Sequence, residues 1–149
     1  MAAPSRNAQL LTQDELAWRI DELYRALDEF NDGYYFESHE TLEDLWLVTP
    51  LPDRTLFQGI IQIAAAYVHL ARGEVAGAVK LLDAAVAKLR AFAPAALGID
   101  IDAMAEAAAA VRVQLARDGG EMSLRGAVRN APRWRYVRVP AAERCENSN

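Results

Sequence analysis

The stretch YYFESHETLEDLW, residues 34–46, places a histidine and several carboxylates among aromatic and aliphatic residues. On a helix that turns about 100° per residue, His39, Glu40 and Glu43 fall within an arc of about 100°. An imidazole and carboxylates on one helix face are typical of a metal site or a catalytic site. The same groups also form polar clusters that only hold helices in register. The sequence leaves both interpretations open.

A second polar stripe follows in the next apolar segment. We call it the amide stripe, and its members are Arg54, Gln58, Gln62 and His69. These four side chains fall within about 80° on a helical wheel. Burying them without partners would be costly, and consecutive helices joined by a short loop usually pack together. We therefore expect the two stripes to face each other in a shared interior, where the amide stripe donates hydrogen bonds to Glu40 and Glu43.

Metal binding has limited support in this pattern. The zinc signature HExxH needs two imidazoles one turn apart, but the fifth position here is Glu43, which makes the motif HExxE. A metal-dependent hydrolase would use His39, Glu43 and His69 as ligands, with Glu40 as the general base. Di-iron proteins need an ExxH motif, and neither Glu37 nor Glu40 precedes a histidine by three residues. We expect no metal and no other cofactor, and the hydrolase is the alternative.

Nucleophilic catalysis has less support still. Ser38 directly precedes His39, so their side chains point apart on a helix. The chain has no GxSxG motif and no phosphate-binding glycine loop. The question of enzymatic activity stays open, and the main hypothesis is a structural or small-ligand-binding cluster. Its candidate residues are His39, Glu40, Glu43, Trp46, Arg54, Gln58, Gln62 and His69.

Five helices are predicted to position these groups. They span about 12–30, 34–47, 53–72, 74–92 and 100–117. A capping box begins at Thr12, while Pro50 and Pro52 prevent the second helix from continuing. No long β pattern interrupts the helices. We expect an all-α fold, a compact multihelical bundle of about five helices with a polar central helix pair and an extended C-terminal strap.

The charge distribution divides the chain into three parts. Residues 1–11 are expected to be a flexible leader, 12–120 the helical domain and 121–149 a basic extended tail. The tail carries six arginines and three glutamates, a charge of +3, whereas residues 1–120 carry −8 and the whole chain −5. Alternation of period two within 132–140 predicts an extended segment. This Arg-rich tail either covers its own acidic body or acts as an interaction module for an acidic partner.

Composition narrows the function classes. The apolar fraction of 52% and the charged fraction of 25% are those of an ordinary globular domain. Cys145 is the single cysteine, which excludes an internal disulfide. The acidic body argues against nucleic-acid binding, and no apolar run reaches membrane-spanning length. We expect a cytoplasmic protein, a homodimer, without a nucleic-acid or membrane partner and with a possible small-molecule ligand.

The order of these motifs resembles a known family. The run FNDGYYFESHETLEDLW, the pattern RxxxQGxxQxAAAxxH, then GxxxGA and LGID, over about residues 22–105, resemble the domain of unknown function 309 family. The resemblance implies a compact multihelical prokaryotic-type protein with a relatively polar central helix and no established activity. The positions it would mark are Phe36, His39, Glu40, Glu43, Trp46, Arg54, Gln58, Gln62 and His69.

Overall fold

The structure, a computed structural model, describes residues 13–49, 53–118 and 126–138. Five long helices, a two-stranded hairpin and, within the tail, a helical turn at 126–129 form the regular elements of these residues. The long helices and the strands are α2 (Gln13–Asn31), α3 (Tyr35–Val48), α4 (Asp53–Ala71), α5 (Val75–Arg90), β1 (Ala95–Ala96), β2 (Ile99–Asp100) and α6 (Ile101–Asp118). The predicted all-α fold is confirmed. The small hairpin formed by β1 and β2 was not predicted, since only a turn was expected there. The proposed leader 1–11 lies outside the described residues.

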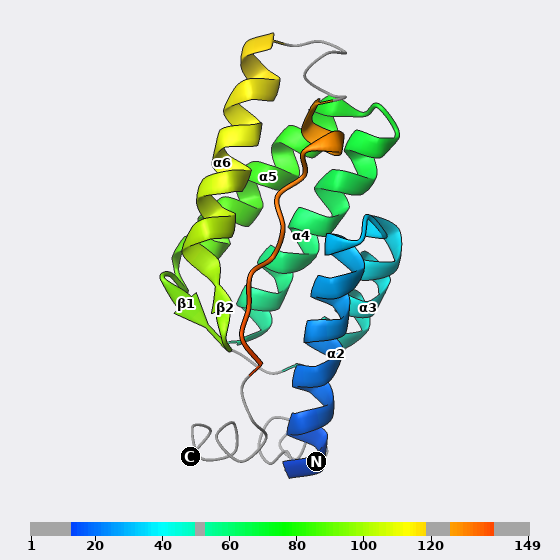
Figure 1. Ribbon diagram of the computed structural model, residues 1–149, viewed down its shortest axis with the longest axis vertical. Helices are drawn as coiled ribbons and strands as arrows, with labels where there is room; N and C mark the ends of the chain where they lie inside the picture. Colours follow the sequence, from blue (N-terminus) through cyan, green and yellow to red (C-terminus); the bar gives the residue numbers. More distant parts are fainter. Residues whose placement is uncertain (1–12, 50–52, 119–125, 139–149) are drawn as a thin grey trace, which may run out of the picture.

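The helices pack in chain order, each against the next (Figure 1). Helix α4 lies between α3 and α5, while α2 packs on α3 and α6 packs on α5. The centre of the bundle is therefore α4, the helix that carries the amide stripe. No helix among the described residues is both long enough and apolar enough to cross a membrane.

Two glycines end helices α2 and α4 in the same way. Gly33 and Gly73 have φ values of +89° and +80°, a conformation that glycine adopts without a steric penalty. The amide after each glycine donates back five residues, from Tyr34 to the carbonyl of Glu29 at 2.8 Å and from Glu74 to that of His69 at 2.9 Å. This is the Schellman arrangement, which satisfies the last carbonyls of a helix.

The core contains an apolar stripe of α2. Ile20, Leu23, Leu27 and Phe30 are at most 4% exposed. Helix α5 approaches α4 closely at Gly59, where a Cβ atom would lie 3.2 Å from Cβ of Lys88. A glycine at position 59 therefore allows α5 to pack closely on α4.

The described part of the tail, residues 126–138, lies across the bundle beside α2 and the hairpin (Figure 1). Trp134 is only 3% exposed, and the Asn31 side chain exchanges two hydrogen bonds with its backbone, at 2.7 and 2.9 Å. The Tyr136 ring stacks on Tyr24 at 4.7 Å. The extended segment is confirmed for residues 131–138, and it covers the body of its own chain.

Candidate functional site

Helix α3 has one buried face, and the predicted carboxylates are not on it. The buried residues are Ser38, Thr41, Leu42 and Leu45, whereas Glu40 and Glu43 are exposed. The expectation that both carboxylates share a buried interior with the amide stripe is therefore wrong. The reason is steric, because α3 packs on α2 and α4 at once and its inward sector is already filled.

Two ring contacts fix how α3 lies against α4. The Arg54 guanidinium carbon lies 4.2 Å from the centre of the Trp46 ring, and the Tyr35 and Tyr67 rings lie 5.3 Å apart. These pairs show that the helices run antiparallel, with the amide stripe half-buried along their boundary. Among the described residues, no hydrogen bond or ion pair joins the stripe to the carboxylates of α3. The buried Nε of Arg54 and Oε1 of Gln62 also have no partner there.

The two histidines are held separately. Nε2 of His39 lies 3.7 Å from Oε2 of Glu43, one turn along α3. Nδ1 of His69 lies 2.7 Å from Oε1 of Glu74, and a Cβ atom at Gly77 would lie 3.0 Å from that nitrogen. Within the described ranges, no three His, Cys, Asp or Glu residues are grouped so that they could hold a metal ion. The alternative ligand set of His39, Glu43 and His69 is therefore not assembled.

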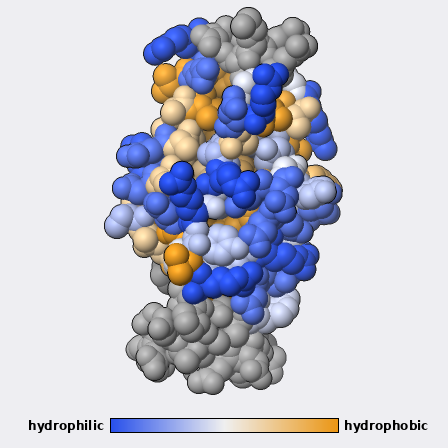
Figure 2. All heavy atoms as spheres, in the orientation of Figure 1, coloured by the Kyte–Doolittle hydropathy of each residue, from blue (hydrophilic) through white to orange (hydrophobic). Residues whose placement is uncertain are grey.

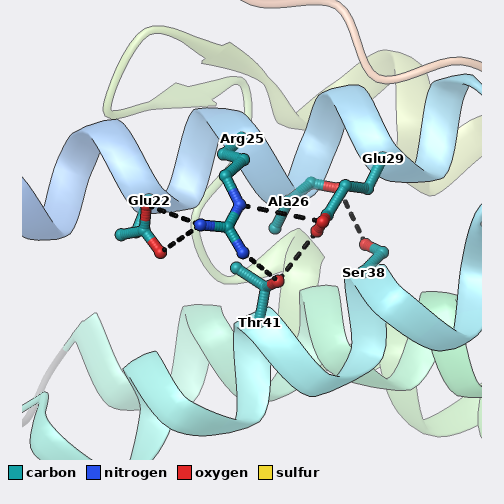
Figure 3. A network of polar contacts seen from close by, with 6 residues as sticks. All are labelled: Glu22, Arg25, Ala26, Glu29, Ser38 and Thr41. Carbon is teal, nitrogen blue, oxygen red and sulfur yellow. Dashed lines mark hydrogen bonds and ion pairs between the residues drawn. The ribbon is translucent and has the colours of Figure 1, made fainter.

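The structure instead joins two buried hydroxyls of α3, those of Ser38 and Thr41, to residues of α2 (Figure 3). Arg25 donates from Nη1 to both oxygens of Glu22, at 3.1 and 3.3 Å, and its Nε lies 3.7 Å from Glu29. The Thr41 hydroxyl donates to Glu29 at 2.8 Å. Beside it, Ser38 donates to the carbonyl of Ala26 at 2.8 Å. These contacts hold α2 and α3 at a fixed spacing.

An open groove of about 430 Å³ runs over this network, and we call it the acidic groove. Its lining residues are Trp18, Glu22, Arg25, Glu29, Glu37, Glu40, Thr41, Glu43, Asp44 and Leu45. Six carboxylates and one guanidinium give the groove a formal charge of −5. Sequence analysis found Glu40 and Glu43 but missed the contribution of α2. The spacing of Glu22, Arg25 and Glu29, three and then four residues, was the available signal.

One large exposed aromatic side chain lines the acidic groove, that of Trp18, which is 55% exposed. On α3, outside the groove lining, Phe36 and Leu47 are 49% and 61% exposed. The Phe36 ring stacks on His39 with 6.5 Å between ring centres. Aromatic faces next to carboxylates are suited to organic cations, which interact with both.

The described residues contain a buried phenol in the bundle core, that of Tyr67. Burial raises the pKa of Tyr67, with a smaller contribution from Tyr35, and its hydroxyl has no hydrogen-bond partner among the described residues. A phenol with a raised pKa stays protonated at neutral pH and is a poor general base. Its neighbours are rings, since Phe30 meets it edge to face at 5.3 Å. We therefore assign Tyr67 to the core.

Comparison with known proteins gives a family-model match over part of the chain and no activity. Residues 23–81 match the family model described as Domain of unknown function (DUF309). This match confirms the resemblance that the motifs indicated, over a shorter range than 22–105. No curated protein and no solved structure matches the chain. The matched range runs from within α2 to within α5 and includes all of α3.

Proposed function

We propose that this protein, in which residues 23–81 carry the DUF309 match, is a non-enzymatic binding protein that takes a cationic ligand in the acidic groove. The observation that carries the proposal is the charge of the groove, in which six carboxylates accompany a single arginine. Like charges at this density repel one another, and a bound cation relieves that repulsion. The ligand-binding role expected from the sequence thus moves from the α3–α4 boundary to the α2–α3 groove.

The one positive charge of the acidic groove, on Arg25, is already paired with carboxylates of α2. Arg25 pairs with Glu22 and Glu29, so it does not neutralise the carboxylates of α3. Within the described ranges, Glu37 and Glu40 have no ion pair at all, and Glu43 has only His39. A ligand amine or guanidinium would therefore meet two carboxylates without a competing cation, those of Glu37 and Glu40.

The exposed aromatic side chain of Trp18 supports the same ligand class. A cation over an indole face gains roughly 0.5–1 kcal/mol at an exposed site. A groove that is open along its length also accommodates a chain of cationic groups, such as basic peptide side chains. A neutral or anionic ligand would gain nothing from the carboxylates and would lose their hydration.

In this proposal, five of the predicted site residues have a structural role and do not bind the ligand. They are Trp46, Arg54, Gln58, Gln62 and His69. Arg54 lies over Trp46 and His69 is held by Glu74, so each of these contacts fixes a helix or helix end. We place the protein in the cytoplasm, a reducing compartment compatible with its single cysteine.

A hexa-arginine peptide tests the proposal through the fluorescence of Trp18. We expect the double variant Glu40→Gln/Glu43→Gln to bind it about 2–30-fold more weakly, since exposed ion pairs contribute roughly 0.2–1 kcal/mol each. The control Asp32→Asn/Asp102→Asn changes the net charge equally at exposed positions outside the groove and should bind almost as the parent does. Equal weakening in both double variants would show nonspecific attraction and would refute the groove as the site.

A further inference from the structure

Helix α6 has an outward stripe that none of the preceding functions uses. Glu106, Ala110, Val113 and Arg117 follow one another at spacings of four, three and four residues, and all four are exposed. These spacings place them on one face of the helix, within about 60°. In Figure 2, small and apolar side chains run along the upper left of the molecule, where Figure 1 places α6. Among the helices, α6 packs only on α5 to any extent.

The two charges of this stripe lie at its opposite ends. Within the described ranges, neither Glu106 nor Arg117 has an ion-pair partner. They are eleven residues apart on one helix, about 17 Å, so they cannot pair with each other within a chain. Arg112, by contrast, is already bonded to Asp83 at 2.8 Å. The stripe thus carries one unpaired charge of each sign, separated by alanine and valine.

This order of residues is complementary to itself. If a second α6 lies antiparallel across the first, with the two-fold axis level with the midpoint of residues 111 and 112, Glu106 of each copy faces Arg117 of the other. Ala110 then faces Val113 of the second copy. A two-fold interface requires this self-complementarity, because the same patch meets itself. We propose that α6 is the homodimer contact of this protein, formed with a second antiparallel α6.

The shape of the helix surface favours the same arrangement. A shallow hollow is lined by Ala109, Ala110, Val113, Gln114 and Arg117. Small side chains let two helix axes approach to about 8 Å, the lower end of the usual range. Val113 of the second copy can then enter this hollow opposite Ala110.

The acidic groove is a poor alternative for this contact. A two-fold dimer through α3 would bring Glu37, Glu40, Glu43 and Asp44 against the same carboxylates of the second copy. Such like-charge juxtaposition disfavours association. The α6 dimer also leaves the acidic groove free, so the dimer proposal and the ligand-binding proposal can be tested independently.

The interface is small, and this sets the expected affinity. From residue 106 to residue 117 the contact is about 17 Å long, which is shorter than a standard interface of about 800 Å² per partner requires. We therefore expect a reversible dimer whose population rises with concentration and falls with added salt.

Charge exchange tests the proposal in the full chain by sedimentation over a concentration series. Glu106→Arg places two arginines together at both ends of the dimer, and Arg117→Glu does the same with glutamates. Each single variant should raise the dimer Kd about tenfold or more. The double variant Glu106→Arg/Arg117→Glu restores opposite charges and should restore the parent Kd. Circular dichroism confirms that each variant remains helical.

Each outcome of the charge-exchange experiment either supports or overturns the proposed α6 contact. Rescue by the double variant supports the antiparallel register and no other, since only that register brings residue 106 to residue 117. A parent chain that stays monomeric at millimolar concentration overturns the proposal. If the dimer Kd is unchanged in all three variants, the proposal is overturned as well, because the contact then lies on another face. The control Asp32→Arg, an exposed change away from α6, reports the effect of net charge alone.

Discussion

Asn31 joins α2 to the C-terminal strap, and its replacement by alanine gives the sharpest test of how that strap is held. Its Nδ2 donates to the carbonyl of Trp134 at 2.9 Å, and its Oδ1 accepts from the Trp134 amide at 2.7 Å. The Asn31 side chain therefore pairs with the backbone N–H and C=O of Trp134, as a neighbouring β-strand would. Trp134 is only 3% exposed. Alanine removes both bonds and leaves both groups of Trp134 unpaired.

The magnitude follows from those two bonds. Each contributes a net stabilisation of about 1 kcal/mol, and leaving partly buried partners unpaired adds to the loss. We expect Asn31→Ala to weaken docking of the strap by about 2 kcal/mol. This loss corresponds to a factor of about 30 in the docking equilibrium. The bond from Arg133 to the Asn31 carbonyl survives, because it uses the backbone.

Amide hydrogen exchange measures this local loss directly. The Asp100 amide donates to the carbonyl of Arg135 and the Val137 amide to that of Gly98, both at 2.8 Å, so both amides report strap docking. Their exchange should accelerate about 30-fold in Asn31→Ala. Asp32→Ala, at the exposed neighbour of Asn31, is the control and should leave both rates unchanged. If Val137 exchanges equally slowly in Asn31→Ala, the clamp contributes nothing and the reasoning fails.

Two further predictions concern the bundle interior. Burial raises the pKa of Tyr67, so the folded protein keeps a proton that the unfolded chain releases near pH 10. The free energy of unfolding should therefore fall as pH rises above 10. Tyr67→Phe should reduce that fall, as measured by urea unfolding at pH 8 to 11. Gly59→Ala should destabilise by about 1 kcal/mol despite the better helix propensity, because its Cβ would lie 3.2 Å from Lys88. Gly77→Ala should be nearly neutral, since the better helix propensity of alanine offsets the cost of displacing the half-exposed His69 ring from Glu74.

Helix boundaries could be predicted because local chemistry decides them. The turn at residues 31–33 ends α2, and the segment with Pro50 follows α3. The hairpin before α6 was harder, since Leu97 has a φ of +52°, a conformation unusual for leucine. Asp100 caps α6, since its Oδ1 accepts from the Ala103 amide at 2.9 Å. The start of this helix could therefore be predicted from residue types, whereas the two strands could not.

The position of the polar site could not be predicted in the same way. A helical wheel gives angles between His39, Glu40 and Glu43, but it does not say which sector faces a neighbour. Helix α3 has apolar residues nearly all round, so its pattern does not identify a buried face. The decisive contacts come from Ser38 and Thr41, short polar residues that bond to α2. Their hydroxyls gave no periodic signal in the sequence.

The strap shows the same limit over a longer range. Its alternation predicted an extended segment, and its charge suggested either an acidic partner or its own acidic body. The structure shows Arg138 3.5 Å from Asp21, yet both side chains are more than half exposed. Surface ion pairs of this kind contribute little. Trp134 and its hydrogen bonds to Asn31 contribute more, and no property of either residue alone predicts that they meet 103 positions apart.

The outward face of α3 carries more apolar surface than folding needs. The inward residues Leu42 and Leu45 already fill the contact with α2 and α4, while Phe36, Leu47 and Val48 remain about half exposed or more. Scattered exposed apolar residues are ordinary, whereas a group on one helix is typical of a binding surface. Under the proposed function, this group would contact apolar side chains of a basic ligand that binds in the acidic groove.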